Sequence, residues 1–248
     1  MPEGHLYHRL ARLQQELVGV GPIEVSSPQG KFADGAAALD GRPLEAVTAR
    51  GKNLFHHFGD DVIHVHLGMQ GIFLRGDGTT EPKKQVRLRL QRPGVANWDL
   101  IAPITCALLT TEEHDHLIGH LGPDPLDPTA DEQRAIDNLR RSGSTIGAAL
   151  LDQKVISGVG NVFRAEALLV EHIHPTARSE DLSVEQLSNL WRTLRELMHA
   201  GEEAGEITPK RIYKQQNCAE CGTATTTSTV AGRTAYTCTT CQPVQRAA

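Results

Sequence analysis

Two hydrophobic periods divide the chain into halves. Over residues 3–18, leucines recur at spacings of four, three and four, which predicts an amphipathic helix with the stripe Leu6, Leu10, Leu13 and Leu17. From about residue 22 to 108 the period becomes two, as in VIHVHLG (62–68) and VRLRL (86–90), with turns such as GDGTTEP (76–82) between the strands. No strand–helix–strand alternation occurs, so this half is expected to be an antiparallel β-sandwich or barrel.

The second half of the chain has the helical period. Four segments are expected to be helices, at residues 131–141, 146–153, 161–172 and 184–201. Ser183, with Gln186 three positions later, predicts a capping box at the start of the last one. The stretch LGPDPLDPT (121–129) is interpreted as a linker. The expected domains are therefore residues 1–122, 123–208 and 209–248.

Four of the five cysteines crowd the end of the chain. They form two C-x2-C pairs separated by sixteen residues, a spacing typical of one tetrahedral zinc ion: Cys218, Cys221, Cys238 and Cys241. Four thiolates leave no open coordination position, so one structural zinc is predicted. The segment between the pairs predicts a hairpin turning at Ala231–Gly232, with Arg233 at its tip, as a phosphate ligand or as an ordinary solvated arginine. Cys106 is expected to be a small core residue.

Composition limits the location and the partners. Of 248 residues, 39% are hydrophobic, and no apolar run is long enough to span a membrane. The N-terminus does not resemble a signal peptide, which favours a cytosolic location. The chain carries a formal charge of −5, but residues 209–248 hold five basic residues and one acidic residue. Because a small basic module is joined to an acidic body, a polyanion remains a possible partner, but no strong non-specific affinity for nucleic acid is predicted.

Three further stretches have a functional and a structural interpretation. In DQKVISGVGNVFRAEAL (152–168), a glycine turn follows Lys154 and Asn161 is expected to be the N-cap of the next helix, which makes either an anion site or a tightly packed hinge. Lys52 in RGK either binds a phosphate or is a solvated edge charge. The histidines His56, His57, His64 and His66 are expected to form a solvated strand face, and no second metal site is predicted.

The first residues, MPEGH, also have two interpretations. Proline and glutamate suit the first turn of a helix, because proline lacks an N–H and glutamate complements the helix dipole. If Met1 is removed, however, Pro2 becomes a secondary amine beside the Glu3 carboxylate. Such an amine can attack an aldehyde-like carbon and form a Schiff base.

Taken in order, these motifs resemble the formamidopyrimidine-DNA glycosylase/endonuclease VIII family. The resemblance rests on Pro2–Glu3, RGK, HLGMQG (66–71), LLDQKVISGVGNVFRAEAL (150–168) and the four-cysteine hairpin, and it covers residues 2 to about 242. It implies an α+β protein: an N-terminal antiparallel β-sandwich with an N-terminal helix, then a helix–two-turn–helix domain ending in a zinc hairpin. DNA is expected between the two domains.

The resemblance also implies a function and roles for single residues. The expected activity is that of a bifunctional DNA glycosylase/AP lyase of base excision repair. Pro2 would be the nucleophile, Glu3 the general acid, and Lys52 and Asn161 phosphate ligands. Lys154 would lie near the damaged nucleotide, Arg233 would bind the flanking phosphate, and Met69 would fill the gap left by the flipped base. The implied setting is a monomer in the bacterial cytoplasm, associated with the nucleoid, without a membrane partner.

Two departures favour the endonuclease VIII branch. The 8-oxoguanine enzymes carry an Arg and a Phe in a D-P-R-R-F-G pattern, which APITCALL (102–109) lacks, and a longer loop before the zinc hairpin than residues 202–217. Oxidised pyrimidines in double-stranded DNA are therefore the expected substrate, with abasic sites and single-stranded or bubble DNA as further ones. The alternatives are an 8-oxoguanine/formamidopyrimidine glycosylase, a non-catalytic damaged-DNA binding protein and a sequence-specific zinc-finger regulator.

Overall fold

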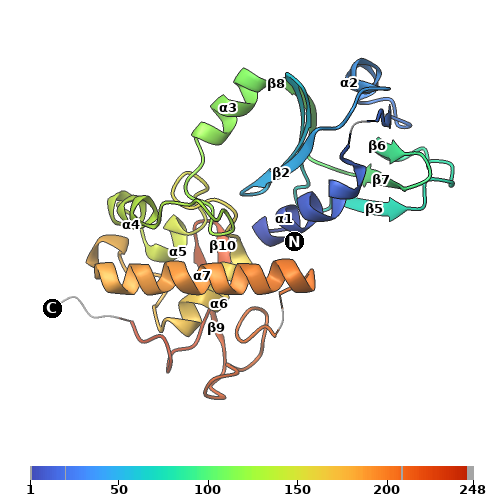
Figure 1. The fold of residues 1–248 in the computed structure, drawn as a ribbon. Coiled ribbons are helices and arrows are strands. Elements are labelled where there is room, and N and C mark those ends of the chain that lie inside the picture. The colour runs from blue at the N-terminus through green and yellow to red at the C-terminus, as the bar shows by residue number, and fades with distance from the viewer. Residues whose placement is uncertain (1, 20, 208, 245–248) are drawn as a thin grey trace. The chain divides into compact units, whose positions relative to one another are not determined.

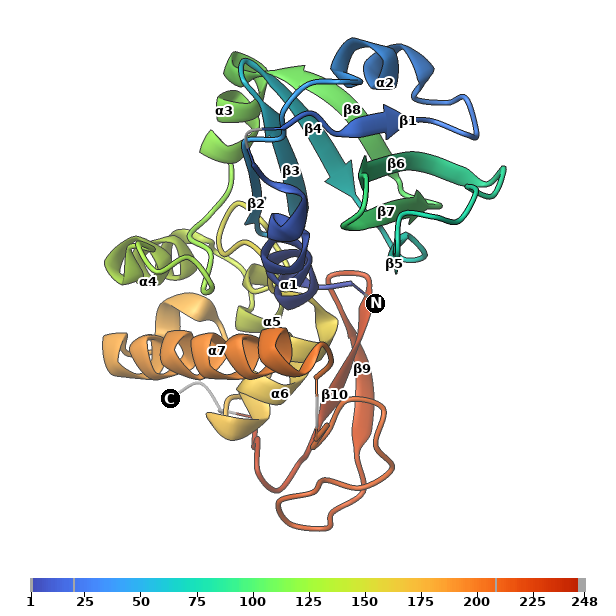
Figure 2. The same cartoon turned by 45° about the vertical axis from the view of Figure 1, so that its right-hand side comes forward.

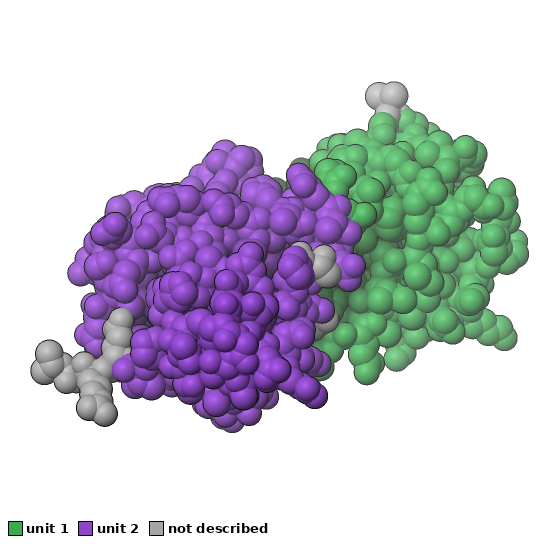
Figure 3. Space-filling model, turned by 90° about the horizontal axis from the view of Figure 1, so that it is seen from below, with its two compact units in different colours: residues 1–2, 6–119 green, residues 3–5, 120–248 purple. Residues whose placement is uncertain are grey.

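The computed structural model describes residues 2–19, 21–207 and 209–244 (Figure 1). The chain divides into two compact units, coloured separately in Figure 3. Unit 1 comprises residues 1–2 and 6–119, and unit 2 comprises residues 3–5 and 120–248. Residues 3–5 therefore belong to unit 2, although they lie at the start of the chain. Among the described residues, no helix is both long and apolar enough to cross a membrane.

Unit 1 is the predicted antiparallel β-sandwich. Its strands form two four-stranded sheets, ordered β1-β6-β7-β5 and β2-β3-β4-β8. The strands are β1 (Glu24–Ser26), β2 (Ala46–Arg50), β3 (Asn53–Phe58), β4 (Asp61–His66), β5 (Ile72–Gly76), β6 (Val86–Arg92), β7 (Ala96–Ile101) and β8 (Thr105–Thr110). The helical elements are α1 (Gly4–Gln14), whose first two residues belong to unit 2, η1 (Gln15–Leu17), α2 (Ala33–Leu39) and α3 (Thr111–Gly119).

The inward faces of both sheets build one core. Leu54 and Ile63 come from one sheet, and Leu88 and Leu100 come from the other. This is the face that the period-two pattern predicts, since alternate residues of a strand point to the same side. The leucine stripe of the first helix is only partly inside, because Leu10 and Leu17 are buried whereas Leu13 is 38% exposed.

The prediction of a solvated histidine face is wrong for His56 and His64, whereas His57 and His66 are partly exposed. His56 lies in the core, where its ring nitrogen Nε2 is 2.7 Å from Gln14 Oε1, and burial lowers its pKa to about 3. On the opposite face of the sheet, His64 is also buried and its pKa is lowered to about 4. Helix α3 covers this second face, and the His114 ring lies 4.6 Å from that of Phe55.

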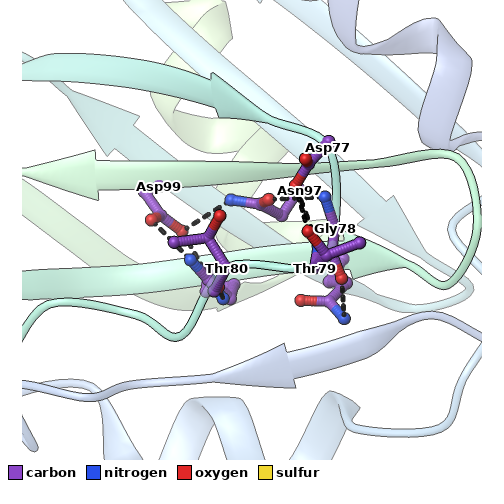
Figure 4. A network of polar contacts seen from close by, with 8 residues as sticks. Asp77, Gly78, Thr79, Thr80, Asn97 and Asp99 are labelled. Carbon is purple, nitrogen blue, oxygen red and sulfur yellow. Dashed lines mark hydrogen bonds and ion pairs between the residues drawn. The ribbon is translucent and has the colours of Figure 1, made fainter.

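A polar network orders the predicted turn at residues 76–82 (Figure 4). Arg89, one of the residues expected on a polar strand face, is instead buried and forms a bidentate ion pair with Asp99, at 2.6 and 2.8 Å. The same guanidinium donates to the backbone oxygen of Thr80. Asn97 accepts a hydrogen bond from Gly78 N at 2.9 Å. The planar guanidinium matches the two oxygens of a carboxylate, so this pair satisfies two of its donors at once.

Unit 2 is helical and ends in a hairpin, as predicted. Its elements are α4 (Glu132–Arg141), α5 (Ile146–Ala149), α6 (Asn161–Val170), η2 (Ser179–Asp181), α7 (Val184–Ala204), β9 (Thr226–Val230) and β10 (Arg233–Thr237) (Figure 2). The capping box of Ser183 and Gln186 is present at the start of α7. Helix α5 stops at Ala149, short of the predicted residue 153, because a succession of turns follows it. The segment 122–126 is buried in unit 2, so it is part of this fold and not an exposed linker.

Helix α6 is buried on every side. All its residues from Asn161 to Leu169 are buried, including Arg164 and Glu166. A helix that is apolar all round belongs inside a domain, and the two charges within it require partners there. Arg164 bonds to both strands of the hairpin and Glu166 bonds to the segment at residues 211–213, so α6 connects the helical part of unit 2 to its cysteine hairpin.

Candidate functional site

Glu3 is bound to the start of α6. Its carboxylate is fully buried and accepts hydrogen bonds from three backbone N–H groups: Gly160 at 3.0 Å, Val162 at 2.9 Å and Phe163 at 3.3 Å. A helix N-terminus has unpaired N–H groups and a partial positive charge, which a carboxylate satisfies. The carboxylate therefore has a fixed position, set by an element almost 160 residues further along the chain.

Glycines make this approach possible. A Cβ built on Gly160 would lie 2.6 Å from Glu3 Oε1 and 2.7 Å from its Cγ. Gly4, which follows Glu3, donates its N–H to the backbone oxygen of Gly158 at 2.8 Å, and a Cβ on Gly4 would meet the Gly158 backbone at the same distance. The SGVG turn is thus a tight packing turn, as one of the two interpretations predicted, and its packing partner is the start of α1.

Asn161 is the first residue of α6 and not its N-cap. Gly160 occupies the cap position, and no side-chain hydrogen bond caps the helix from there. The capping carboxylate comes instead from Glu3. The Asn161 side chain is consequently available for other contacts: Nδ2 donates to the backbone oxygen of Thr234 in β10 at 3.0 Å, and Oδ1 accepts from Arg164.

Positive charge gathers at this end of α6. Burial, and to a smaller extent the positive charge of Arg233, lower the pKa of Arg164 to about 10, so the two cations are close enough to repel each other. Arg233 begins β10, opposite Val230 and next to the Ala231–Gly232 turn, as the hairpin prediction stated. Like charges held together favour an anionic ligand. Lys154 is exposed in the turn before α6, where its N–H donates to Asp152.

The remaining predicted residues belong to unit 1. Pro2 is partly exposed and directly precedes Glu3 in the chain, whereas Met1 lies outside the described residues. Lys52 occupies the turn between β2 and β3. Burial lowers the pKa of His66, and the positive charge of Lys52 lowers it further, which places the two side chains near each other. Met69 lies in the loop after β4 and is 73% exposed.

The four terminal cysteines form one cluster. Their sulfur atoms lie within 4.8 Å of one another, with Cys221 and Cys238 at 3.4 Å and Cys218 and Cys241 at 4.0 Å. Tetrahedral coordination with metal–sulfur bonds of about 2.3 Å needs sulfurs roughly 3.8 Å apart, so these side chains fit one metal ion. In the described part of the chain, this is the one group of three or more such side chains with the geometry of a metal site.

Cys106 agrees with its prediction. It packs against the core of unit 1, and burial raises the pKa of its thiol to about 12. A thiol of this kind is not an effective nucleophile, because the thiolate is the reactive form.

Sequence analysis missed Arg164, Gly160 and Glu166. Glu166 accepts three backbone N–H bonds, from Arg211, Ile212 and Tyr213, at 2.7, 3.2 and 2.9 Å. It thereby fixes the segment that leads into the cysteine module. The available signal was the arginine and the glutamate inside NVFRAEALLV, a helix that is otherwise almost entirely apolar.

Comparison with known proteins identifies the class. The formamidopyrimidine-DNA glycosylase N-terminal domain matches residues 1–99, and the formamidopyrimidine-DNA glycosylase H2TH domain matches residues 121–212. Together these two models cover more than half of the chain, on both sides of the boundary between the units. The fold and the site therefore define a DNA glycosylase/AP lyase of base excision repair.

Individual relatives agree with this class. Endonuclease 8 1 of Mycobacterium tuberculosis is 38% identical over 268 residues, covering 98% of this chain and 100% of the relative. The formamidopyrimidine-DNA glycosylase of Thermobifida fusca is 29% identical, covering 99% and 98%. The Lactococcus lactis formamidopyrimidine-DNA glycosylase, solved with DNA containing an AP site, superposes with a TM-score of 0.82 at 23% identity, covering 97% and 99%, and so supports the fold. The chain belongs to the formamidopyrimidine-DNA glycosylase/endonuclease VIII family.

Proposed function

We propose that this enzyme excises oxidised pyrimidines from double-stranded DNA and cleaves the resulting abasic site through Pro2. The observation that carries the proposal is the fixed carboxylate of Glu3 at the N-terminus of α6. It gives the residue next to Pro2 a defined position in a fold that the chain shares with the formamidopyrimidine-DNA glycosylase quoted above. The relative with the highest identity quoted above carries the name endonuclease 8, which agrees with this branch.

The proposed reaction begins with the amine of Pro2 after removal of Met1. The neutral nitrogen attacks C1′ of the flipped nucleotide, the C1′–base bond breaks, and the base leaves and takes a proton from solvent. The Glu3 carboxylate accepts the proton that the Pro2 nitrogen releases and passes it to the sugar-ring oxygen as the ring opens to the iminium. The resulting iminium withdraws electrons, so the C2′ proton is lost and the C3′–oxygen bond breaks. A second elimination breaks the C5′–oxygen bond and leaves a one-nucleotide gap. Hydrolysis of the iminium then regenerates Pro2.

The phosphate ligands are proposed from the two units separately. Lys52 in unit 1, and Asn161 and Arg233 in unit 2, would hold phosphates near the lesion, with Lys154 beside the damaged nucleotide. The gathering of cations at the start of α6 supports the second group. We also propose one structural zinc ion on the four cysteines, which would hold the hairpin that carries Arg233.

The preference for pyrimidines rests on two loops. Ile104 stands in the stretch APITCALL, where the 8-oxoguanine enzymes carry arginine and phenylalanine, and its side chain is 72% exposed next to Gly68. An isoleucine cannot donate a hydrogen bond to a base, whereas an arginine can. Met69, also strongly exposed, remains as the wedge for the vacated space. The chain between α7 and Cys218 is short, which leaves the lesion pocket open and extends the substrates to single-stranded and bubble DNA.

Borohydride trapping tests the proposed function. The purified protein is incubated with a labelled duplex carrying an abasic site, then with one carrying 5-hydroxyuracil, and covalent adducts are counted on a denaturing gel. We expect adducts with both duplexes, their loss in Pro2→Gly with unfolding unchanged, and one zinc ion per chain in the same preparation. An adduct with the abasic duplex alone would remove the pyrimidine preference, and 8-oxoguanine would be tested next. No adduct with a confirmed Pro2 terminus would leave a damage-binding protein.

The remaining proposals concern the setting. A monomer acting in the bacterial cytoplasm, on the nucleoid, agrees with the bacterial relatives that match over nearly their whole length. Size-exclusion chromatography with light scattering should give the mass of one chain, 27.0 kDa.

A further inference from the structure

Arg164 is a buried arginine whose hydrogen bonds all go to uncharged groups. It is 1% exposed, and its guanidinium donates to three backbone oxygens, at Gly147, Val230 and Thr234, and to Asn161 Oδ1. A buried guanidinium is costly to desolvate, and aliphatic packing of similar volume would avoid that cost. Its contacts join α5, α6 and both strands of the hairpin, which points to a role beyond filling space.

The contact with Asn161 determines which way the amide faces. A guanidinium has only donors, so the atom of Asn161 that meets it must be the oxygen. The amide nitrogen is then turned to the other side, where one of its two hydrogens is bonded to the Thr234 oxygen. With the reverse orientation, an N–H would face the guanidinium, and Thr234 would lose one donor. Arg164 thus leaves Asn161 presenting a donor, the group that a phosphate requires.

The same guanidinium also fixes the hairpin that carries Arg233. It binds the backbone oxygens of Val230, which ends β9, and Thr234, which follows Arg233 in β10. Two of the proposed phosphate ligands are therefore held by one side chain. The partial charges of the three carbonyl oxygens offset its positive charge, and the charge of Glu3 raises its pKa against the effect of burial.

We propose that Arg164 is a positioning residue for phosphate binding: it orients the amide of Asn161 and holds the base of the Arg233 hairpin, and it does not itself contact DNA. This inference rests on the proposed phosphate role of Asn161. It predicts that the effect of removing Arg164 on DNA binding passes largely through Asn161, so that the two substitutions do not add.

A double-mutant cycle tests this prediction. The dissociation constant for a duplex with a tetrahydrofuran abasic analogue is measured for wild type, R164M, N161A and the double variant. Methionine fills similar space without donors. We expect each single variant to bind about tenfold more weakly, the effect of losing one charge-assisted hydrogen bond, and the double variant to be within about threefold of N161A. Arg178→Met removes an exposed arginine paired with Glu180, and it should bind like wild type.

Further measurements distinguish a failure of this inference from a loss of folding and from a failure of the proposed function. Zinc content and the urea midpoint are measured for each variant, and R164K, which keeps the charge but not the fork, should recover part of the affinity. Loss of zinc or of cooperative unfolding in both R164M and R164K would overturn the proposal, because Arg164 would then serve the fold alone. Additive effects in the cycle, or wild-type binding by N161A, would also overturn it. If the wild-type protein formed no covalent adduct on borohydride treatment, the proposed function itself would instead be contradicted.

Discussion

The substitution Gly160→Ala should displace the carboxylate of Glu3. The backbone at residue 160 has φ −124° and ψ −162°, an extended conformation that alanine adopts without strain. The three atoms nearest to the added methyl group all belong to the Glu3 side chain, with Oε1 at 2.6 Å and Cγ at 2.7 Å. Since the backbones of α6 and of residues 3–5 are packed together, the flexible carboxylate is the group that moves.

The cost follows from the contacts that the carboxylate would lose. Glu3 accepts three hydrogen bonds and is fully buried. A hydrogen bond to a charged group contributes about 1.5–3 kcal/mol net, and donors left unpaired in the interior cost a similar amount. If the methyl group removes one or two of the three bonds, the free energy of unfolding should fall by about 1.5–6 kcal/mol.

Urea unfolding of four proteins isolates this cause: wild type, Gly160→Ala, Glu3→Ala and the double variant. Glu3→Ala removes the atoms that the methyl group meets, so Gly160→Ala should cost less than about 0.5 kcal/mol in that background. An equal cost in both backgrounds would refute the reasoning, since the methyl group would then act on something other than Glu3. Borohydride trapping by the folded Gly160→Ala protein should fall toward the level of Glu3→Ala.

Two further predictions concern charge. Arg233→Ala should weaken binding to all duplexes and reduce the slope of log affinity against log salt by about one, measured by fluorescence anisotropy at several salt concentrations; an unchanged slope would remove Arg233 from the phosphate ligands. Burial lowers the pKa of three histidines from about 6.5 to between 3 and 4, so the unfolded chain binds more protons below pH 6.5 and stability is lost as pH falls from there toward 4. The free energy of unfolding should drop by roughly 3–4 kcal/mol from pH 7.5 to 5.5. Replacing each of these histidines, His5, His56 and His64, by glutamine should make the free energy of unfolding depend less on pH. If the wild-type free energy did not change between these two pH values, the burial of the three histidines would be contradicted.

Local patterns were sufficient to predict the helical and strand regions and the cysteine cluster, although they missed helix α2. The C-x2-C spacing brings pairs of thiols together within a few residues, and the hairpin between the pairs closes the rest, so no distant segment is needed. The capping box of α7 is local in the same way. The alternation of β4 and β6 also predicted which residues share a face.

Contacts between distant segments could not be predicted from those patterns. Asn161 was expected to cap α6, because its own sequence neighbourhood offers no better candidate, yet the capping group is Glu3 from the other end of the chain. The alternation that placed His64 on the second face of its sheet contains no information about α3, which covers that face. The alternation of VRLRL likewise contains no information about the carboxylate partner of Arg89, since Asp99 lies on the neighbouring strand.

The polar groups of the buried helix α6 each bind a group from another part of the chain. Its N–H groups hold Glu3, its arginine holds Asn161 and the hairpin, and its glutamate holds the segment at residues 211–213. Each contact fixes a group from elsewhere in the chain against the same rigid helix. Geometry set in this way changes little when a loop moves, because a buried helix opens only with the whole unit. A site whose acid and phosphate ligands must hold one geometry is therefore better built on α6 than on the loops themselves.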